Sequence, residues 1–276
     1  MCGIVGRLSY GTSAARALDL SSIAHRGPDS HGDWEDENKR CWLGHTRLAI
    51  LDTSDAGNQP MESRDGRYVI VFNGEIYNHR KLRAQMPEVT WRSESDTGTI
   101  LQLFNQRGMD MCAYLKGMFA LAIYDRDQST LFAARDRFGI KPLYYRHTPS
   151  ILEFSSEVRI LEGDRALNLS SSAVANYLAY GHLPGVGHLG EGIFSLPPGC
   201  YMTANNEGKL SIEKYWIAGE NPMNSREQPT SVEKKVHDLV ETSVREHLLS
   251  DVPVASFLSG GIDSSVVTLL AGREMG

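Results

Sequence analysis

A cysteine directly behind the first methionine is the residue with the clearest chemical potential in this chain. Methionine is commonly excised before so small a residue, which would leave Cys2 with both a thiol and a free α-amine. Such an amine titrates at about pH 8, so it can take the proton of the thiol without a second side chain. The sequence therefore predicts an N-terminal nucleophile at Cys2, with an incidental cysteine as the alternative.

Cleavage of an amide such as that of glutamine also needs an oxyanion hole and groups that hold the two charged ends of the amino acid. Asn73, Gly74 and Glu75 follow an apolar stretch, and one side-chain amide with one backbone N–H are usual parts of an oxyanion hole. Arg47 has the planar fork that grips a carboxylate through two parallel hydrogen bonds. Asp96 precedes a predicted helix, where it would hold an ammonium group.

Each of these residues also has a structural interpretation that the sequence leaves open. Asn73-Gly74 is typical of a hairpin turn, Arg47 of a surface position at a strand start, and Asp96 of a helix cap. The segment His25–Asp29 is a rigid polar turn that we expect to shape the surroundings of the nucleophile. His25 is not needed as a base if the terminal amine serves.

A glycine- and serine-rich loop lies near the C-terminal end. Residues Val252–Leu258 predict a buried strand, Ser259–Ser265 (SGGIDSS) a loop, and Val266–Ala271 an apolar helix. Strand, glycine loop and helix in this order are typical of an α/β nucleotide-binding domain, because backbone N–H groups at a helix N-terminus suit phosphate oxygens. A plain helix-capping turn is the alternative.

The elements that must position these residues are mostly short strands. Antiparallel sheets are expected because several hairpins follow one another with few helices between them. A composition rich in Asn, Pro, Ser and Glu then marks a linker, followed by a helix with an apolar stripe from Val232 to Val244. The predicted strands are 5–8, 68–72 (ending in a turn at Asn73-Gly74), 119–124 with 131–135, and 143–145 with 152–155; Arg47 enters another at 44–50, and helices follow Ser95 and span 171–180.

Composition bounds the function class. The chain has 276 residues, 41% of them hydrophobic and 22% charged, which is ordinary for a water-soluble globular protein. A net charge of −6 without a basic stripe argues against nucleic-acid binding, and no apolar stretch is long enough for a membrane span. The four cysteines show neither a disulfide nor a zinc pattern, so we expect a reducing, cytoplasmic location.

Taken together, the motifs resemble the N-terminal-nucleophile glutaminase domain of class II amidotransferases, and glutamine-hydrolysing asparagine synthetase in particular. The match spans essentially the whole chain in the right order. The segments that carry it are Cys2–Ile4, His25–Asp29, Arg47-Leu48, Asn73–Asn78, Ser95–Thr97, Arg135-Asp136, Gly139–Tyr145, Leu196–Gly199, Tyr215-Trp216, Ser250–Pro253 and Ser259–Ser265.

This resemblance implies an α+β fold. Residues 1–216 would form a four-layer αββα sandwich, residues 217–230 a linker, and residues 231–276 the start of an α/β ATP-pyrophosphatase domain. Cys2 would attack the amide of L-glutamine, with Asn73 and Gly74 as the oxyanion hole. The implied glutamine-binding residues are Arg47, Leu48, Ala49, Ile50, Leu51, Asn73, Gly74, Glu75 and Asp96.

The resemblance also implies a second reaction. ATP would adenylate the β-carboxylate of L-aspartate, and ammonia would displace AMP to give asparagine. Asp263 is the candidate contact for Mg²⁺. The implied ATP-binding residues are Leu258, Ser259, Gly260, Gly261, Asp263, Ser264 and Ser265.

Two departures from the family pattern affect these expectations. While Met1 remains, the nitrogen of Cys2 is an amide and the base is missing. The family's synthetase domain also continues well beyond the point where this sequence stops, so we expect a partial asparagine synthetase. Another class II amidotransferase, an enzyme with a different ammonia acceptor and a glutamine-binding fragment without turnover are the alternatives; a homodimer is left open.

Overall fold

The computed structural model describes residues 1–11, 14–163, 168–220 and 229–275. It divides into two compact units, Met1–Ile217 and Ala218–Gly276. Most of the linker predicted at 217–230 lies outside the described residues. Among the helices in the described ranges, none is both long and apolar enough to span a bilayer.

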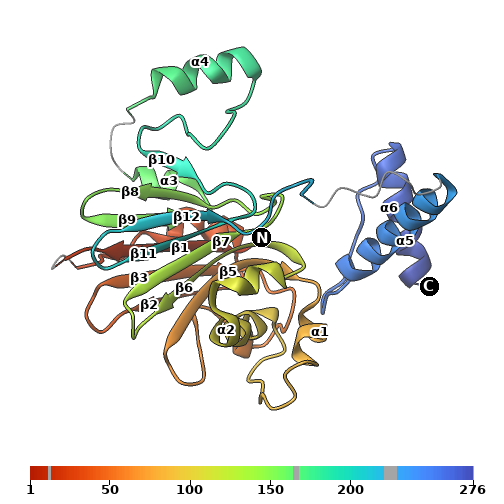
Figure 1. Ribbon diagram of the computed structural model, residues 1–276, viewed down its shortest axis with the longest axis horizontal. Helices are drawn as coiled ribbons and strands as arrows, with labels where there is room; N and C mark the ends of the chain where they lie inside the picture. The colour runs from red at the N-terminus through yellow and green to blue at the C-terminus, as the bar shows by residue number, and fades with distance from the viewer. Residues whose placement is uncertain (12–13, 164–167, 221–228, 276) are drawn as a thin grey trace. The chain divides into compact units, whose positions relative to one another are not determined.

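Two six-stranded antiparallel sheets form the first unit (Figure 1). The first sheet has the order β10-β8-β9-β1-β3-β2, from β1 (Gly3–Ser9), β2 (Ser30–Glu35), β3 (Cys41–Arg47), β8 (Tyr144–His147), β9 (Ile151–Ser155) and β10 (Ile193–Ser195). The second has the order β12-β11-β7-β6-β5-β4, from β4 (Met61–Glu62), β5 (Tyr68–Ile76), β6 (Gly117–Asp125), β7 (Thr130–Arg135), β11 (Cys200–Asn205) and β12 (Leu210–Lys214).

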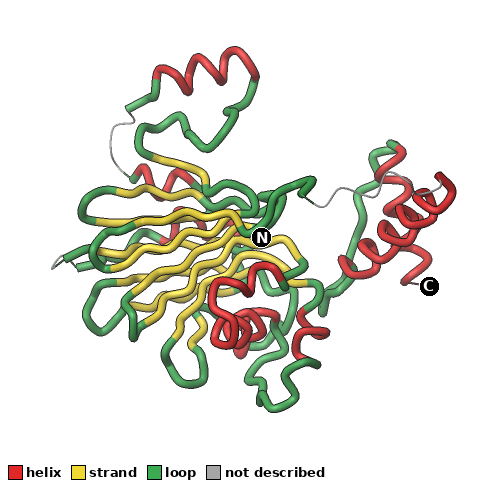
Figure 2. Tube along the Cα trace, in the orientation of Figure 1, coloured by secondary structure: helices red, strands yellow, loops and turns green. Residues whose placement is uncertain are grey.

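Helices cover the outer faces of both sheets (Figure 2). On the first sheet, apolar residues of η1 (Leu20–Arg26) and α3 (Val158–Glu162) pack against β1 and β3. On the second, α1 (His79–Arg83), α2 (Asp96–Arg107) and η3 (Gly108–Ala113) pack against β5 and β6. The four-layer αββα sandwich expected from the sequence is therefore confirmed.

Alternate residues of strand β5 face two different hydrophobic cores. Val69 and Val71 join the core between the two sheets, whereas Ile70 and Phe72 join the core beneath α2. Side chains alternate between the two faces of a strand, so Asn73 has the parity of Val71 and its side chain faces the space between the sheets.

The turn predicted at Asn73-Gly74 is wrong. Strand β5 continues through both residues to Ile76, with Asn73 opposite Ala120 and Gly74 opposite Phe119 in β6. A Cβ atom on Gly74 would lie only 2.2 Å from the carbonyl oxygen of Met118. This glycine is therefore needed because two strands pass so closely, and not because the chain reverses there.

The prediction for the strand around Arg47 was also misplaced. β3 runs from Cys41 to Arg47, so Arg47 is the last residue of the strand and not its entry point. The hairpins predicted around residues 125–130 and 147–151 are confirmed as β6–β7 and β8–β9. The helix predicted after Ser95 is α2.

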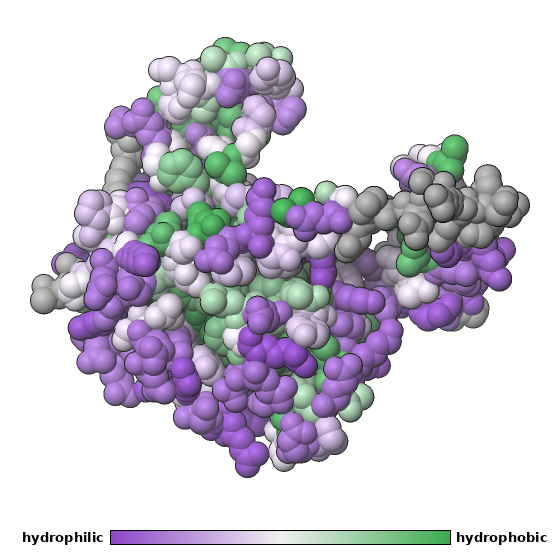
Figure 3. All heavy atoms as spheres, in the orientation of Figure 1, coloured by the Kyte–Doolittle hydropathy of each residue, from purple (hydrophilic) through white to green (hydrophobic). Residues whose placement is uncertain are grey.

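The helix predicted at 171–180 is confirmed as α4 (Ser171–Tyr180), which has no buried residue. Its large apolar side chains Tyr177, Leu178 and Tyr180 are exposed. Figure 3 shows hydrophobic atoms on and below this helix, while much of the rest of the visible face of the unit is hydrophilic.

The second unit consists of α5 (Pro229–His247) and α6 (Ile262–Met275), packed through Val244, Leu270 and Ala271. The buried strand predicted at Val252–Leu258 is wrong. The segment forms no strand, and Phe257 is 99% exposed. The apolar pattern was correctly recognised, but the described residues of this unit hold no other strand to pair with the segment.

Candidate active site

Cys2 lies immediately before β1, and its side chain contacts the chain that leaves β3. The N–H of Leu48 lies 3.4 Å from Sγ, and Sγ lies 3.5 Å from the carbonyl oxygen of the same residue. Cys2 has the parity of Ile4, which faces the core between the sheets. The thiol therefore lies at the open end of the space between the two sheets.

A small cavity of about 30 Å³ brings most of the predicted glutamine-site residues together. They come from the ends of β1, β3 and β5 and from the start of α2, although they are up to 94 positions apart (Cys2 to Asp96). Of the predicted residues, the cavity is lined by Cys2, Arg47, Leu48, Ile50, Leu51, Gly74, Glu75 and Asp96.

Two predicted residues do not line this cavity. Ala49 turns its N–H toward the carboxylate of Asp29, at 2.8 Å. Asn73 directly precedes Gly74 in β5, and it is only 1% exposed. The side-chain amide nitrogen of Asn73 is buried and has no hydrogen-bond partner among the described residues. Since an unpaired buried donor is costly, this amide is available to a group that the protein itself does not supply.

Burial sets the protonation of the nucleophile and of its neighbouring amine. It raises the pKa of the Cys2 thiol, and the hydrogen bond from Leu48 only partly opposes this. Burial also lowers the pKa of the Met1 amine, which lies within electrostatic reach of the thiol. Burial thus favours the neutral form of both groups, and a neutral amine beside the thiol is the form that can accept its proton.

The turn at His25–Asp29 shapes this site, as predicted. Nε of Arg26 donates to the carbonyl oxygen of Cys2 at 3.0 Å, and Nη1 pairs with Glu157 at 3.1 Å. The ring of His25 instead contacts Glu157 at 2.8 Å, and its side chain is 57% exposed. His25 therefore holds the turn and does not face the thiol, in agreement with its exclusion as the base.

Arg47 closes the loop that follows it. Its guanidinium donates to the carbonyl oxygen of Ser54 at 2.7 Å and to Oδ1 of Asn58 at 2.8 Å. The other Nη atom donates to the carbonyl oxygens of Leu51, at 3.4 Å, and of Asp52. In this structure the fork predicted to grip a carboxylate thus grips loop oxygens, at the wall of the cavity.

Asp96 is the first residue of α2 and is 4% exposed. Its Oδ2 accepts a hydrogen bond of 2.7 Å from the N–H of Ile76 in β5. Burial raises the pKa of this carboxyl group to about 7, against the opposing effect of the backbone hydrogen bonds. A buried carboxylate of this kind gains most from a cationic ligand, because the ligand's charge offsets the cost of ionisation.

Lys141 is a buried residue near the site to which the sequence alone gives no individual role. This lysine is 5% exposed, and burial lowers its pKa, while Glu75 and the Cys2 thiol favour its charged form. Lys141 is therefore a second amine within electrostatic reach of the Cys2 thiol, besides the chain terminus. The signal in the sequence is a lone lysine in the otherwise apolar run Gly139–Tyr145.

In the second unit, the predicted phosphate loop leads directly into α6. Gly260 has φ +82°, a left-handed conformation that favours glycine. Oγ of Ser259 lies 3.0 Å from Oγ of Ser264, and the N–H of Ser265 donates to the carbonyl oxygen of Gly261 at 3.0 Å. The hydroxyls thus gather at a helix N-terminus, beside the exposed Leu258 and Asp263.

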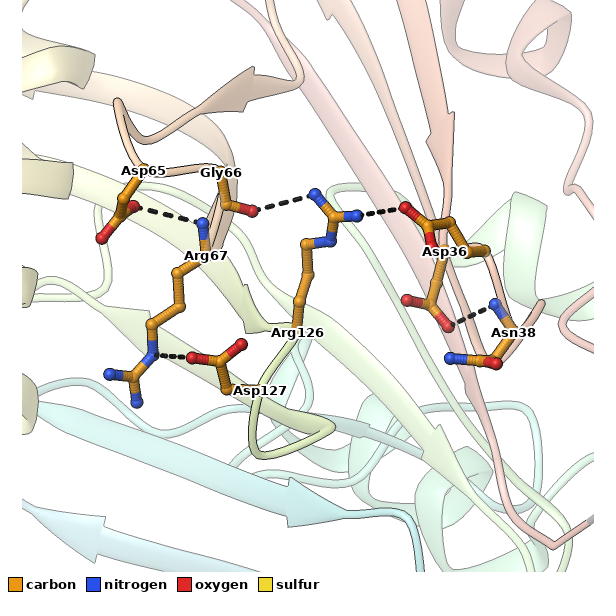
Figure 4. Close-up of a pocket in the computed structure, with 8 residues that line it drawn as sticks. Asp36, Asn38, Asp65, Gly66, Arg67, Arg126 and Asp127 are labelled. Atoms are coloured by element: carbon orange, nitrogen blue, oxygen red, sulfur yellow. Dashed lines mark hydrogen bonds and ion pairs between the residues drawn. The ribbon is translucent and has the colours of Figure 1, made fainter.

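A polar cavity of about 590 Å³ lies among the loops β2–β3, β4–β5 and β6–β7, at the strand ends away from Cys2 (Figure 4). Arg126 donates to the carbonyl oxygen of Gly66 at 3.0 Å and pairs with Glu37 at 2.6 Å. Arg67 pairs with Asp127 at 3.4 Å. These charges tie the hairpin loops of the two sheets together, and the cavity contains no predicted site residue.

Family models match both units. A glutamine amidotransferase domain model covers residues 1–216, and an asparagine synthase model covers residues 235–276. The chain is 34% identical to asparagine synthetase [glutamine-hydrolyzing] 1 of Bacillus subtilis, over 98% of this chain and 44% of that protein. It is 31% identical to asparagine synthetase B of Escherichia coli, over 99% of this chain and 45% of that protein. The chain spans about half the length of such relatives.

Solved structures agree on the fold. The glutamine phosphoribosylpyrophosphate amidotransferase of B. subtilis, complexed with ADP and GMP, matches with a TM-score of 0.57 and 16% identity, over 99% of this chain and 64% of that one. An allosteric regulatory enzyme of purine biosynthesis matches with a TM-score of 0.56 and 19% identity, over 78% of this chain and 49% of that one. Because the domain model covers more than half of its residues, the chain belongs to the glutamine amidotransferase domain family.

Proposed function

We propose that the first unit hydrolyses glutamine, with Cys2 as the nucleophile once Met1 has been removed. The observation that carries this proposal is the single cavity in which Cys2 meets Arg47, Gly74 and Asp96 in a chain of this family. They supply a nucleophile and a backbone donor for cleavage of the side-chain amide. They also supply a cation and an anion for the two charged ends of the amino acid.

The chemistry would run in two steps. The free amine of Cys2 takes the thiol's proton, and the thiolate attacks the side-chain carbonyl carbon of glutamine. The C–N bond breaks as the amine returns the proton to the leaving nitrogen, which departs as ammonia and leaves a γ-glutamyl thioester. Water then attacks the thioester, the amine accepts its proton, and glutamate leaves as the thiol is restored.

Arg47 and Asp96 would hold the two charged ends of glutamine. The cavity is small, about 30 Å³, and Ser54 and Asn58 occupy donors of Arg47, so we propose that residues 48–58 move when glutamine binds. We propose that the α-carboxylate of glutamine then takes over guanidinium donors that now serve Ser54 and Asn58. Asp96 would accept the α-ammonium group.

Replacement of Arg47 with lysine is expected to raise the KM for glutamine by roughly ten- to a hundredfold, since a fork that donates two charge-assisted bonds becomes a point charge. The kcat should change much less, because the carboxylate is held equally in the ground state and the transition state. Steady-state kinetics of glutamate release measure both constants. An unchanged KM would remove Arg47 from substrate binding.

Glutamine affinity is also expected to depend on pH through Asp96. Its pKa of about 7 in the folded protein leaves the carboxyl group largely neutral at pH 6. The KM should therefore rise as the pH falls below about 7 and level off above about 8. Kinetics across this range with the Asp96→Asn variant provide the check, because the variant should have a high KM without this dependence.

The same shift predicts the sign of a stability effect. An aspartate in the unfolded chain titrates at about pH 4, whereas Asp96 in the folded protein keeps its proton up to about pH 7. The folded state binds this proton more tightly than the unfolded state, so the free energy of unfolding falls as the pH rises from about 4 to about 7. Asp96→Asn should then raise the melting temperature at pH 8 more than at pH 4.

We further propose that the ammonia serves the amidation of L-aspartate to asparagine, driven by ATP, as the names of the relatives suggest. Ser259, Gly261 and Ser265 at the start of α6 would receive the pyrophosphate portion of ATP, with Leu258 against the nucleotide. Magnesium is usually held by one or two carboxylates together with substrate phosphates, and Asp263 in the first turn of α6 fits this donor set. The ion would neutralise the phosphate charge.

A glutaminase assay separates the candidate functions. Glutamate and ammonia should form in equal amounts from glutamine once Met1 is removed, and only slowly while it is retained. Mass spectrometry of the intact protein reports the state of the terminus. Binding of glutamine without glutamate release, in protein with a free Cys2 amine, would favour a glutamine-binding role without turnover.

A further inference from the structure

Strand β5 has an open edge beyond the end of its short neighbour β4. Successive N–H groups of a strand point alternately to its two sides. The N–H of Tyr77 donates to the carbonyl oxygen of Lys116, next to β6, so the odd-numbered residues face β6. The N–H groups of Phe72, Gly74 and Ile76 therefore lie on the open edge, which runs past Cys2 and Asp96.

Two buried side chains fix the first peptide groups on this edge. The N–H of Phe72 donates to Oε1 of Gln59 at 2.6 Å, and the carbonyl oxygen of Phe72 lies 3.1 Å from Nε2 of His45. Since a carbonyl can only accept, Nε2 carries the proton. Met61 in β4 lies opposite Ile70 in β5, so an extension of the antiparallel pairing by two residues would place Gln59 opposite Phe72. Its side chain therefore replaces a missing strand.

The same edge ends at the substrate cavity. Ile76 donates to Asp96, so Gly74 lies between two peptide groups that side chains hold in place. Gln59 also donates to Oγ1 of Thr97, next to Asp96, at 3.2 Å. The side chain of Asn73 and the N–H of Gly74 follow the Phe72 carbonyl by one and two positions, and Nδ2 of Asn73 has no hydrogen-bond partner among the described residues.

We propose that His45 and Gln59 are positioning residues for the oxyanion hole, acting through the peptide groups of Phe72. This inference rests on the proposed glutamine hydrolysis. His45 is fully buried and reaches from β3 in one sheet to β5 in the other, so it fixes the spacing between the sheets at the place where Asn73 must face Cys2. Burial lowers the pKa of His45 to about 4, so its ring is neutral and does not compete for a proton at neutral pH.

The test compares His45→Leu with His45→Gln, which keeps a side-chain N–H. His45→Leu should lower the kcat for glutamine about ten- to a hundredfold with the KM within about threefold, because the oxyanion forms only in the transition state. His45→Gln should recover kcat to within about threefold of the original. Val71→Ala is the matched control, since it loosens packing next to Phe72 without touching either hydrogen bond, and it should keep kcat.

A second variant covers the case in which His45→Leu does not fold. Gln59→Met keeps the length of the side chain but removes both hydrogen bonds, and it should lower kcat about tenfold or more. Gln59→Glu keeps an acceptor for the N–H of Phe72, so its kcat should fall less than that of Gln59→Met. The inference is overturned if both loss variants keep kcat within about threefold, or if Val71→Ala loses as much as they do.

Hydrogen exchange separates this inference from the proposed function. If the protein with a free Cys2 amine does not hydrolyse glutamine, the proposed function fails. Hydrogen exchange of the backbone amides of residues 72–76 still shows whether His45 holds this part of β5 in place. These amides should exchange at least tenfold faster in His45→Leu than in His45→Gln or Val71→Ala. Equal exchange in all three variants would overturn the inference.

Discussion

Replacement of Cys2 with alanine is expected to lower glutamine hydrolysis by at least about four orders of magnitude, because no other group can form the thioester. Within the described ranges the thiol forms hydrogen bonds only with the backbone of Leu48, so its loss should leave the fold and the melting temperature nearly unchanged. Glutamate release by Met-processed protein measures the rate. Glutamine binding, measured by calorimetry, should persist in the variant.

Cys112 provides the matched control for this prediction. It is also a free cysteine, but it is fully buried in η3 beneath the second sheet and does not line the cavity. Cys112→Ala should keep glutamine hydrolysis within about twofold. If Cys2→Ala retained hydrolysis, or if Cys112→Ala abolished it, Cys2 would not be the nucleophile.

The general architecture followed from the sequence because its signals are local. The alternation of Val69, Ile70 and Val71 assigns each residue to one of two cores, and short polar turns join strands that pair as hairpins. Tertiary pairing overrode a local signal at Asn73-Gly74. Those residues favour a turn in isolation, but a long neighbouring strand at β6 extends β5 through them.

The candidate site was only partly predictable. The types of Cys2, Arg47 and Asp96 indicated their chemistry, but their convergence depends on three strand ends and a helix start that no local pattern links. The roles of His45 and Gln59 follow from register, since an open strand edge cannot be read from single residues. The segment Val252–Leu258 shows the converse limit, because an apolar run becomes a strand only where another strand pairs with it.

Asn73→Ala is expected to lower kcat by about a hundred- to a thousandfold, the usual effect of losing one oxyanion donor, with little change in KM. The amide nitrogen of Asn73 is buried and finds no hydrogen-bond partner in the described part of the chain, so it adds nothing to the stability of the folded protein in the absence of substrate. Its removal should therefore leave the free energy of unfolding unchanged or raise it. Activity and stability would move in opposite directions, as expected for a group kept for catalysis.

Asn78, two positions beyond the end of β5, is the matched control because the protein itself uses both ends of its side chain. Its Nδ2 donates to the carbonyl oxygen of Tyr114 at 2.9 Å, and its Oδ1 accepts from the N–H of Lys116 at 2.9 Å. Asn78→Ala should cost about 1–3 kcal/mol of stability and leave kcat nearly unchanged. Denaturant unfolding and steady-state kinetics of both variants give the comparison, and a stability loss in Asn73→Ala without a loss of kcat would assign Asn73 to the fold and not to the oxyanion.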